Sequence, residues 1–242
     1  FENKRFRMVS AILATADLTA AIPENARRLA SNVSHTERTI TLGEHTVWLE
    51  ETSPPPGHFS KGSVLLLHGQ SFLASTWRES ARVFAATGIH CYAPDLPGCG
   101  RTKGPAVPVG SRPEWLSSLR EALSLSSPLW VVCASESASF VLPHLLEATP
   151  WLKAVVAVAP AHTTAVSSSP AAFNARTPLL LLYGEKDTSL GPTAAANLRV
   201  LPSCRAVRLP EAGHAAHLGN PLLFQSLCLN FFDLIRSYDE SG

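Results

Sequence analysis

The sequence predicts an α/β protein in which a mostly parallel central sheet carries helices on both faces. Short segments such as residues 63–67 (SVLLL) are apolar without interruption, as expected for strands buried on both faces. These segments alternate along the chain with stretches of helical periodicity. Before them, residues 36–51 alternate between polar and apolar around Gly43 and Glu44, which predicts an antiparallel hairpin at one edge of the sheet.

The elements follow one another in a regular order after the hairpin. Short apolar strands are expected at residues 63–67, 89–93, 129–132, 153–159, 178–183 and 205–209. Apolar residues at helical spacing predict helices at residues 76–87, 113–125, 140–146, 194–198 and 221–237. Residues 160–176, rich in Ser and Ala, are expected to be a short connection, which leaves no room for a large lid.

Length and composition bound the class of protein. The 242 residues fit one large domain, expected over residues 35–242. With 45% hydrophobic residues, 16% charged residues and a net charge of +1, the chain offers no concentrated basic surface for nucleic acid. The five cysteines include no Cys-x-x-Cys pair, which favours a reduced intracellular protein over a disulfide framework or a zinc site. We expect a cytoplasmic monomer that can also be present in the nucleus.

Residues 1–34 are expected to form an N-terminal extension. Lys4, Arg5 and Arg7, followed by an apolar run, resemble a weak signal peptide or a short amphipathic helix. Asp17 interrupts this run, which is far shorter than the ~20 residues of a membrane span. We therefore expect a loosely attached tail or helix without a membrane span, and a targeting role stays open.

A sharp turn between a strand and a helix carries the candidate nucleophile. The apolar strand at 129–132 stops at small residues, among which Ser135 has Cys133 two residues before it and Ser137 two after it. This is a loosened form of the Gly-x-Ser-x-Gly nucleophile elbow, in which small neighbours let the chain make a strained turn. Ser137 also has small neighbours and is an alternative nucleophile.

Two further strand ends carry the partners that a nucleophilic serine requires. A serine hydroxyl reacts when an imidazole removes its proton and a carboxylate orients that imidazole. Asp187 follows the strand at 178–183, and His214 follows the strand at 205–209. Either residue alone would be read as a turn residue or a surface histidine. Together with Ser135, at the carboxyl ends of three parallel strands, they predict a catalytic triad.

The developing negative charge on the substrate oxygen needs hydrogen-bond donors. In this type of site they are the backbone N–H of the residue after the nucleophile and an N–H from the loop after an early strand. Those positions are Glu136 and Gln70, and the turn at His68-Gly69 would let Gln70 aim its N–H inward.

Four motifs carry a family resemblance. They are VLLLHGQSF at 64–72, APDLPGCGRT at 93–102, LLLLYGEKDT at 179–188 and AGH at 212–214. Over residues 36–236 the chain resembles the α/β-hydrolase superfamily and, within it, the α/β-hydrolase domain-containing 14 group. Leu142-Pro143 matches a Leu-Pro pair that follows the elbow of that group, which places Ser135 at the nucleophile. The order serine, acid, histidine is also that of the superfamily.

The elbow departs from the group at three positions. Cys133 replaces a serine, Ala138 replaces a glycine, and the acidic Glu136 stands where the group has an apolar residue. A carboxylate is unfavourable beside a developing oxyanion, so the Glu136 side chain is expected to point away from Ser135.

The resemblance implies the α/β-hydrolase fold and a serine hydrolase or acyltransferase that acts through an acyl-serine intermediate. It also implies small acyl substrates, including acetylated protein lysines, with coenzyme A as an acyl acceptor. No metal or redox cofactor is expected. The altered elbow leaves one alternative open, a catalytically weak or inactive binding protein on the same fold.

Overall fold

The computed structural model of the chain describes residues 11, 13–22, 24–125 and 129–240. The strands are β1 (Ser34–Leu42), β2 (His45–Ser53), β3 (Gly62–Leu67), β4 (Ile89–Pro94), β5 (Leu129–Ala134), β6 (Leu152–Val158), β7 (Leu179–Gly184) and β8 (Cys204–Leu209). The α-helices are α2 (Glu24–Leu29), α3 (Arg78–Ala86), α4 (Arg112–Ala122), α5 (Ala138–Leu146), α6 (Thr164–Ser167), α7 (Leu190–Leu198), α8 (Ala216–Gly219) and α9 (Pro221–Glu240). Short 3-10 turns are η1 (Ala74–Trp77), η2 (Val109–Ser111), η3 (Ser135–Ser137) and η4 (Pro170–Asn174).

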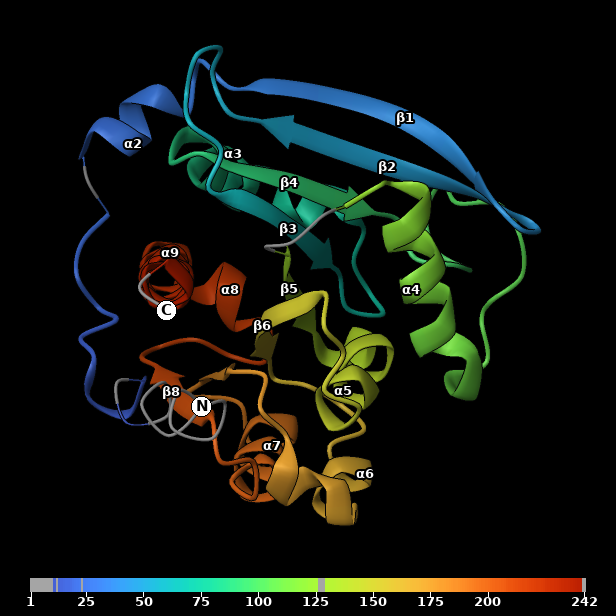
Figure 1. The fold of residues 1–242 in the computed structure, drawn as a ribbon, viewed down its shortest axis with the longest axis vertical. Coiled ribbons are helices and arrows are strands. Elements are labelled where there is room, and N and C mark those ends of the chain that lie inside the picture. Colours follow the sequence, from blue (N-terminus) through green and yellow to red (C-terminus); the bar gives the residue numbers. More distant parts are fainter. Residues whose placement is uncertain (1–10, 12, 23, 126–128, 241–242) are drawn as a thin grey trace.

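The eight strands form one sheet in the order β1-β2-β4-β3-β5-β6-β7-β8 (Figure 1). The pairs β1·β2 and β2·β4 are antiparallel, and the pairs from β4·β3 to β7·β8 are parallel. The predicted fold class, with its opening hairpin, is therefore confirmed. Between β6 and β7 the chain forms only α6 and η4, which the sequence did not predict, so the cap over the sheet is minimal as expected.

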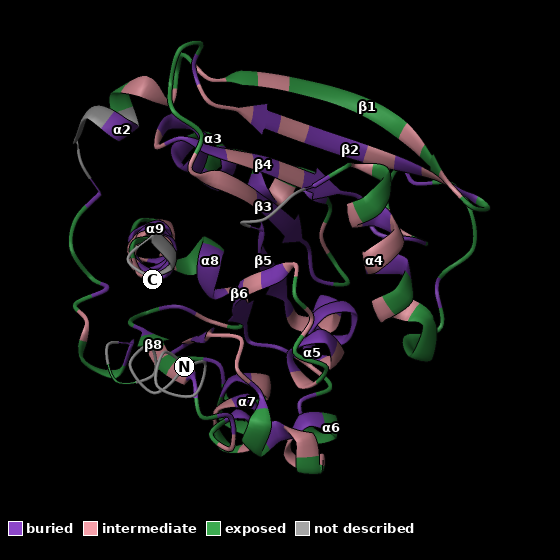
Figure 2. Cartoon of the chain, viewed as in Figure 1, coloured by how far each residue is buried: buried purple, intermediate pink, exposed green. Residues whose placement is uncertain are grey.

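Apolar side chains fill both faces of the sheet. Along β3, Val64 and Leu66 belong to the cluster that contains α3 and α9, whereas Leu65 and Leu67 belong to the cluster that contains α4 and α5. The central strands are accordingly buried along most of their length (Figure 2). The uninterrupted apolar segments of the sequence reflect this double burial.

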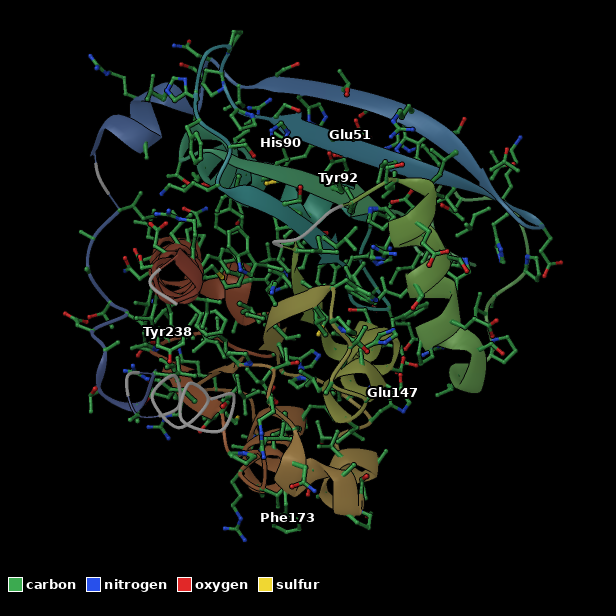
Figure 3. All side chains as sticks on the ribbon, viewed as in Figure 1. Glu51, His90, Tyr92, Glu147, Phe173 and Tyr238 are labelled. Carbon is green, nitrogen blue, oxygen red and sulfur yellow. The ribbon has the colours of Figure 1, made fainter. Side chains whose placement is uncertain are left out.

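The opening hairpin extends the sheet beyond β4. Glu51 of β2 lies opposite Tyr92 of β4 in the antiparallel register (Figure 3). The outer strand β1 is mostly exposed and polar, as expected for the edge of a sheet. The hairpin thus shields β4 and leaves a polar strand at the border.

The described part of the N-terminal extension packs onto the fold and is not loosely attached. Leu13 and Leu18 are each only 1% exposed and lie in the α3–α9 cluster. The backbone of this stretch is held by the Arg205 guanidinium, which donates to the Leu13 carbonyl at 2.8 Å, and by Asn230, which donates to the Leu18 carbonyl at 2.9 Å. The basic residues before position 11 lie outside the described residues, and a boundary at residue 34 and a targeting role stay predictions.

Two expectations about the environment of the chain can be compared with the structure. Across the described ranges, no helix has both the length and the apolar character that a membrane crossing requires. All five cysteines are free, as expected without a disulfide framework. The cytoplasmic location and the monomeric state stay predictions.

The packing of the N-terminal segment yields a stability prediction. Leu18→Ala should lower the free energy of unfolding by about 2–4 kcal/mol, because the substitution leaves a cavity in the core. Leu222→Ala, at a position that is 50% exposed, is the control and should change it by less than about 0.5 kcal/mol. Urea denaturation of both variants measures the difference, and equal effects would show that the segment does not contribute to the core.

Candidate active site

Ser135, His214 and Asp187 meet at the carboxyl edge of the sheet. They follow β5, β8 and β7, three strands whose carboxyl ends point the same way. The His214 Nε2 atom lies 3.1 Å from the Ser135 hydroxyl oxygen, and His214 Nδ1 lies 3.1 Å from Asp187 Oδ2. An ionised carboxylate can only accept, so Nδ1 carries the proton and Nε2 is free to accept the serine proton. Side chains distant in the sequence thus form one hydrogen-bonded chain.

Ser135 occupies a strained turn of the kind that the elbow motif predicts. Its φ angle is +52°, in the left-handed region that residues with a side chain rarely adopt. A Cβ atom on Gly69 would lie 3.4 Å from the Ser135 Cβ, which is van der Waals contact, so the loop after β3 packs closely against the turn. The turn leaves Ser135 partly exposed at the end of a fully buried strand.

The alternative nucleophile Ser137 is buried and hydrogen-bonded to the backbone of the turn. It is 1% exposed, and its hydroxyl oxygen accepts from the Ala134 N–H at 2.9 Å. The same hydroxyl lies 3.0 Å from the carbonyl oxygen of Leu67, to which it can donate. The Ala134 carbonyl oxygen is an acceptor at a similar distance, 2.9 Å, so the Ser137 hydroxyl faces the backbone of the turn and of β3, whereas the hydroxyl of Ser135 faces His214.

The environment of Asp187 keeps its carboxylate ionised. Burial alone would raise the pKa of this carboxyl, but hydrogen bonds from Ser189 and His214 outweigh burial and lower the pKa below its ordinary value. One oxygen accepts the Ser189 N–H at 3.0 Å, and the other accepts the Gly191 N–H at 3.1 Å as well as His214. The carboxylate is thus fixed in place while it orients the imidazole.

A glycine at the end of β7 brings the Asp187 and His214 loops together. A Cβ atom on Gly184 would lie 2.1 Å from the Gly213 carbonyl oxygen, which no larger residue could accommodate without a shift. Next to this contact, the Lys186 N–H donates to the Ala212 carbonyl at 2.8 Å. The two loops are therefore in direct backbone contact.

The loop after β3 holds the peptide that carries the Gln70 N–H in a fixed orientation. The His68 ring lies within hydrogen-bond distance of the Gly69 carbonyl at 2.8 Å, and its other nitrogen accepts the Leu96 N–H at 2.9 Å. Burial lowers the pKa of His68, so the ring is neutral and its Nδ1–H donates to Gly69. Because the Gly69 carbonyl and the Gln70 N–H belong to one planar trans peptide, fixing the carbonyl also fixes the direction of the N–H.

A cavity of about 350 Å³ opens beside both candidate oxyanion donors. Gln70 and Glu136 form part of its wall, and apolar side chains such as Leu96, Val107 and Phe140 form another part. This volume lies at the lower end of the range typical for small-molecule pockets. A small acyl group could therefore sit next to the donors.

The Glu136 carboxylate is bound to two side chains from other parts of the chain. Its Oε1 accepts from Arg112 at 2.5 Å, and its Oε2 lies 2.9 Å from His162 Nε2. The sequence predicted that this carboxylate points away from Ser135, but not its partners. Two residues of the site, Arg112 and His162, had no individual signal in the sequence. His68 was indicated only as part of the His-Gly turn.

One group of described side chains has the types and spacing of metal ligands, at the opposite edge of the sheet. It consists of His35, Glu37 and Glu50. The buried Glu50 carboxylate already accepts hydrogen bonds from Arg78 at 2.7 Å and from Arg101 at 3.2 Å. Two guanidinium groups already compensate the negative charge of these carboxylates, so the charge balance does not favour a cation here. That the protein needs no metal stays a prediction.

A second histidine supports the loop that carries His214. His217 is 4% exposed and stacks on Trp77 with ring centroids 4.5 Å apart. Neither ring nitrogen has a hydrogen-bond partner among the described residues. Burial, with a smaller effect of His214, lowers the pKa of His217 to about 4, so the ring is neutral at pH 7.

Comparison with known proteins gives consistent matches. Residues 64–135 match the model of a family described as "Alpha/beta hydrolase family". ABHD14B of Rattus norvegicus, provisionally named a protein-lysine deacylase, is 33% identical over 207 residues, which cover 83% of this chain and 97% of that protein. ABHD14A of Mus musculus is 32% identical over 218 residues, which cover 87% and 86%.

Solved structures show the same fold at lower sequence identity. A CIB-like hydrolase from Thermoplasma acidophilum is 20% identical, with a TM-score of 0.72 over 85% of this chain and 99% of that chain. The carboxylesterase CesB from Bacillus subtilis is 15% identical, with a TM-score of 0.68 over 95% and 98%. These two likenesses support the fold alone.

The buried His217 predicts a pH dependence of stability. Its pKa falls from an ordinary 6.5 to about 4 on folding, so the unfolded chain binds a proton between these values and the folded chain does not. The contribution of His217 is therefore present above pH 6.5 and is lost as the pH falls towards 4, by about 1.4 kcal/mol per pH unit within that window. His217→Phe should lose less stability than the wild type between pH 7 and pH 5, measured by urea denaturation. Equal losses would contradict the prediction.

Proposed function

This chain belongs to the α/β-hydrolase family, and from that premise we propose that it is a serine hydrolase that works through an acyl-serine intermediate. In this proposal Ser135 is the nucleophile, His214 is the general base and acid, and Asp187 orients His214. The observation that carries the proposal is the continuous hydrogen-bonded chain from Ser135 to His214 and Asp187, with both distances at 3.1 Å. Such a chain is the geometric requirement for activating a serine.

The first half of the reaction transfers the acyl group to the enzyme. The Ser135 oxygen forms a bond to the carbonyl carbon of the substrate while its proton passes to His214 Nε2. The tetrahedral intermediate collapses when its bond to the leaving group breaks, and His214 returns the proton to that group. Because Asp187 stays ionised, it stabilises the imidazolium that exists between the two steps.

The second half releases the acyl group. A water molecule or a thiol gives its proton to His214 and attacks the acyl-serine carbonyl, and His214 then protonates the departing Ser135 oxygen. In both halves the N–H groups of Gln70 and Glu136 would stabilise the negative oxygen. The His68 contact to the Gly69 carbonyl supports this role, because it fixes the peptide that carries the Gln70 N–H.

The substrate class proposed is a small acyl ester or amide, including the acyl group of a protein lysine. The cavity of about 350 Å³ at the oxyanion donors suits a short acyl chain. The minimal cap leaves the serine accessible to a large carrier such as a protein side chain. The protein-lysine deacylase name of the ABHD14B relative supports this class, and coenzyme A is proposed as an acyl acceptor beside water.

The altered elbow suggested an alternative hypothesis, a catalytically weak or inactive binding protein on the same fold. It would require the Glu136 carboxylate to cover Ser135 or the turn to be relaxed. The carboxylate is instead bound to Arg112 and His162, and Ser135 keeps its left-handed φ of +52°. These contacts favour the enzyme over the binding protein, and the labelling experiment below separates the two.

Labelling with a fluorophosphonate probe tests the nucleophile. The wild type should be labelled and should hydrolyse 4-nitrophenyl acetate, and Ser135→Ala should abolish labelling and lower hydrolysis by roughly 10³-fold or more, because the attacking oxygen is gone. Ser137→Ala is the matched variant: it should still be labelled but lose about 1–3 kcal/mol of stability, since the Ala134 N–H loses its partner. An unlabelled wild type would favour the binding protein, and loss of labelling only in Ser137→Ala would move the nucleophile to that residue.

A panel of acyl substrates tests the proposed size limit and the acceptor. We expect acetyl and butyryl esters to react with a higher kcat/KM than a lauroyl ester, because the cavity volume of about 350 Å³ limits the acyl chain. With an acetyl-lysine peptide, added coenzyme A should yield acetyl-coenzyme A, measured by mass spectrometry. A preference for lauroyl would contradict the size limit, and free acetate as the sole product would make water the only acceptor.

A further inference from the structure

We propose that Arg112 and His162 are positioning residues that hold the Glu136 carboxylate and thereby keep the oxyanion hole usable. The inference rests on the proposed function, because it concerns the N–H of Glu136 beside Ser135. A carboxylate on the residue after the nucleophile creates a problem that an apolar side chain would not. Arg112 and His162, from two other parts of the chain, bind this carboxylate and compensate its charge.

The problem is electrostatic. An oxyanion that forms beside Ser135 would be repelled by a neighbouring carboxylate, and repulsion between like charges is strong in a site partly closed to water. Burial by itself would raise the pKa of Glu136, but hydrogen bonds from Arg112 and His162 lower it, so the group stays ionised at neutral pH. The negative charge must therefore be compensated by neighbours rather than removed by protonation.

Arg112 supplies the compensating charge from the start of α4. Its Nη1 donates to Glu136 Oε1 at 2.5 Å and to the Ser139 hydroxyl at 2.7 Å, and its Nε donates to the Val107 carbonyl at 3.2 Å. The guanidinium also lies over the Phe140 ring, 5.3 Å from its centroid. With a side chain only 17% exposed, Arg112 is fixed by several contacts, so it can hold the carboxylate in one place.

His162 holds the second oxygen from the loop after β6. Its Nε2 lies 2.9 Å from Glu136 Oε2, and its φ of +60° shows that the loop adopts a strained turn at this residue. One residue earlier, the Ala161 N–H donates to the Ser135 carbonyl at 2.9 Å. The loop therefore contacts the elbow at two points, the backbone carbonyl of Ser135 and the side chain of Glu136.

The contacts also restrain the backbone of the elbow. The Ser139 hydroxyl, which accepts from Arg112, donates to the Glu136 carbonyl at 2.8 Å. The Arg112 guanidinium thus contacts the Glu136 side chain directly and the Glu136 carbonyl through the Ser139 hydroxyl. The Glu136 N–H belongs to the same planar peptide as the Ser135 carbonyl, which accepts from Ala161, so the loop that carries His162 also fixes the direction of the proposed oxyanion donor.

A double-mutant cycle on a small activated ester tests the inference. Arg112→Ala should lower kcat by about 10–100-fold, because it leaves an uncompensated carboxylate charge beside the oxyanion. In a Glu136→Leu background the same Arg112→Ala change should cost less than about threefold, because no carboxylate remains to be compensated. Arg112→Lys, which keeps the charge, should lose less kcat than Arg112→Ala. The matched control is Arg120→Ala, which removes an arginine from the same helix and should leave kcat unchanged.

The outcomes separate this inference from the proposed function. An equal loss from Arg112→Ala in both backgrounds, or no loss in either, would overturn the positioning role while wild-type hydrolysis that depends on Ser135 would still stand. A wild type without any Ser135-dependent hydrolysis or labelling would overturn both. Thermal unfolding of each variant identifies a loss of fold. If Arg112→Ala does not fold, Arg112→Lys is compared in the wild-type and Glu136→Leu backgrounds instead. A loss of kcat that is equal in the two backgrounds would again overturn the positioning role.

Discussion

The site depends on one strained backbone angle, the left-handed φ of Ser135. Such an angle at a residue with a side chain costs about 1–3 kcal/mol and persists only where the surroundings impose it. Here the Ala161 N–H holds the Ser135 carbonyl, and the Ser137 hydroxyl holds the N–H of Ala134 at the end of β5. The same Ser137 hydroxyl lies 3.0 Å from the Leu67 carbonyl oxygen at the end of β3. The strain is thus balanced by contacts that reach the elbow from β3 and from the loop after β6.

The fold and the meeting of Ser135, Asp187 and His214 could be predicted because both follow from local patterns. Uninterrupted apolar segments predict strands buried on both faces, and parallel strands bring their carboxyl ends to one edge. The residues that follow those strands must then be neighbours. The distances of 3.1 Å agree with this expectation, and their chemical roles are what the proposed function adds.

The partners of Glu136 and the packing of the N-terminus could not be predicted in the same way. Arg112 and His162 reach the elbow only because the start of α4 and the loop after β6 lie on either side of it, and no sequence spacing encodes that. The apolar run that contains Leu13 is short and is interrupted by Asp17, so the sequence indicated a loosely attached tail or helix. Their burial depends on the surface formed by α3 and α9, which exists only in the folded chain.

The attachment of the first described residues has a consequence for biosynthesis. Leu13 and Leu18 are held by Arg205 and Asn230, which lie 192 and 212 positions later in the chain. A ribosome makes this segment before it makes Arg205, Asn230 and the α9 part of the docking surface. Contacts between such distant positions form slowly because a long loop must close before they stabilise anything. Leu13 and Leu18 therefore stay uncovered until the positions up to Asn230 have been synthesised, which is the interval in which a chaperone would have its binding site.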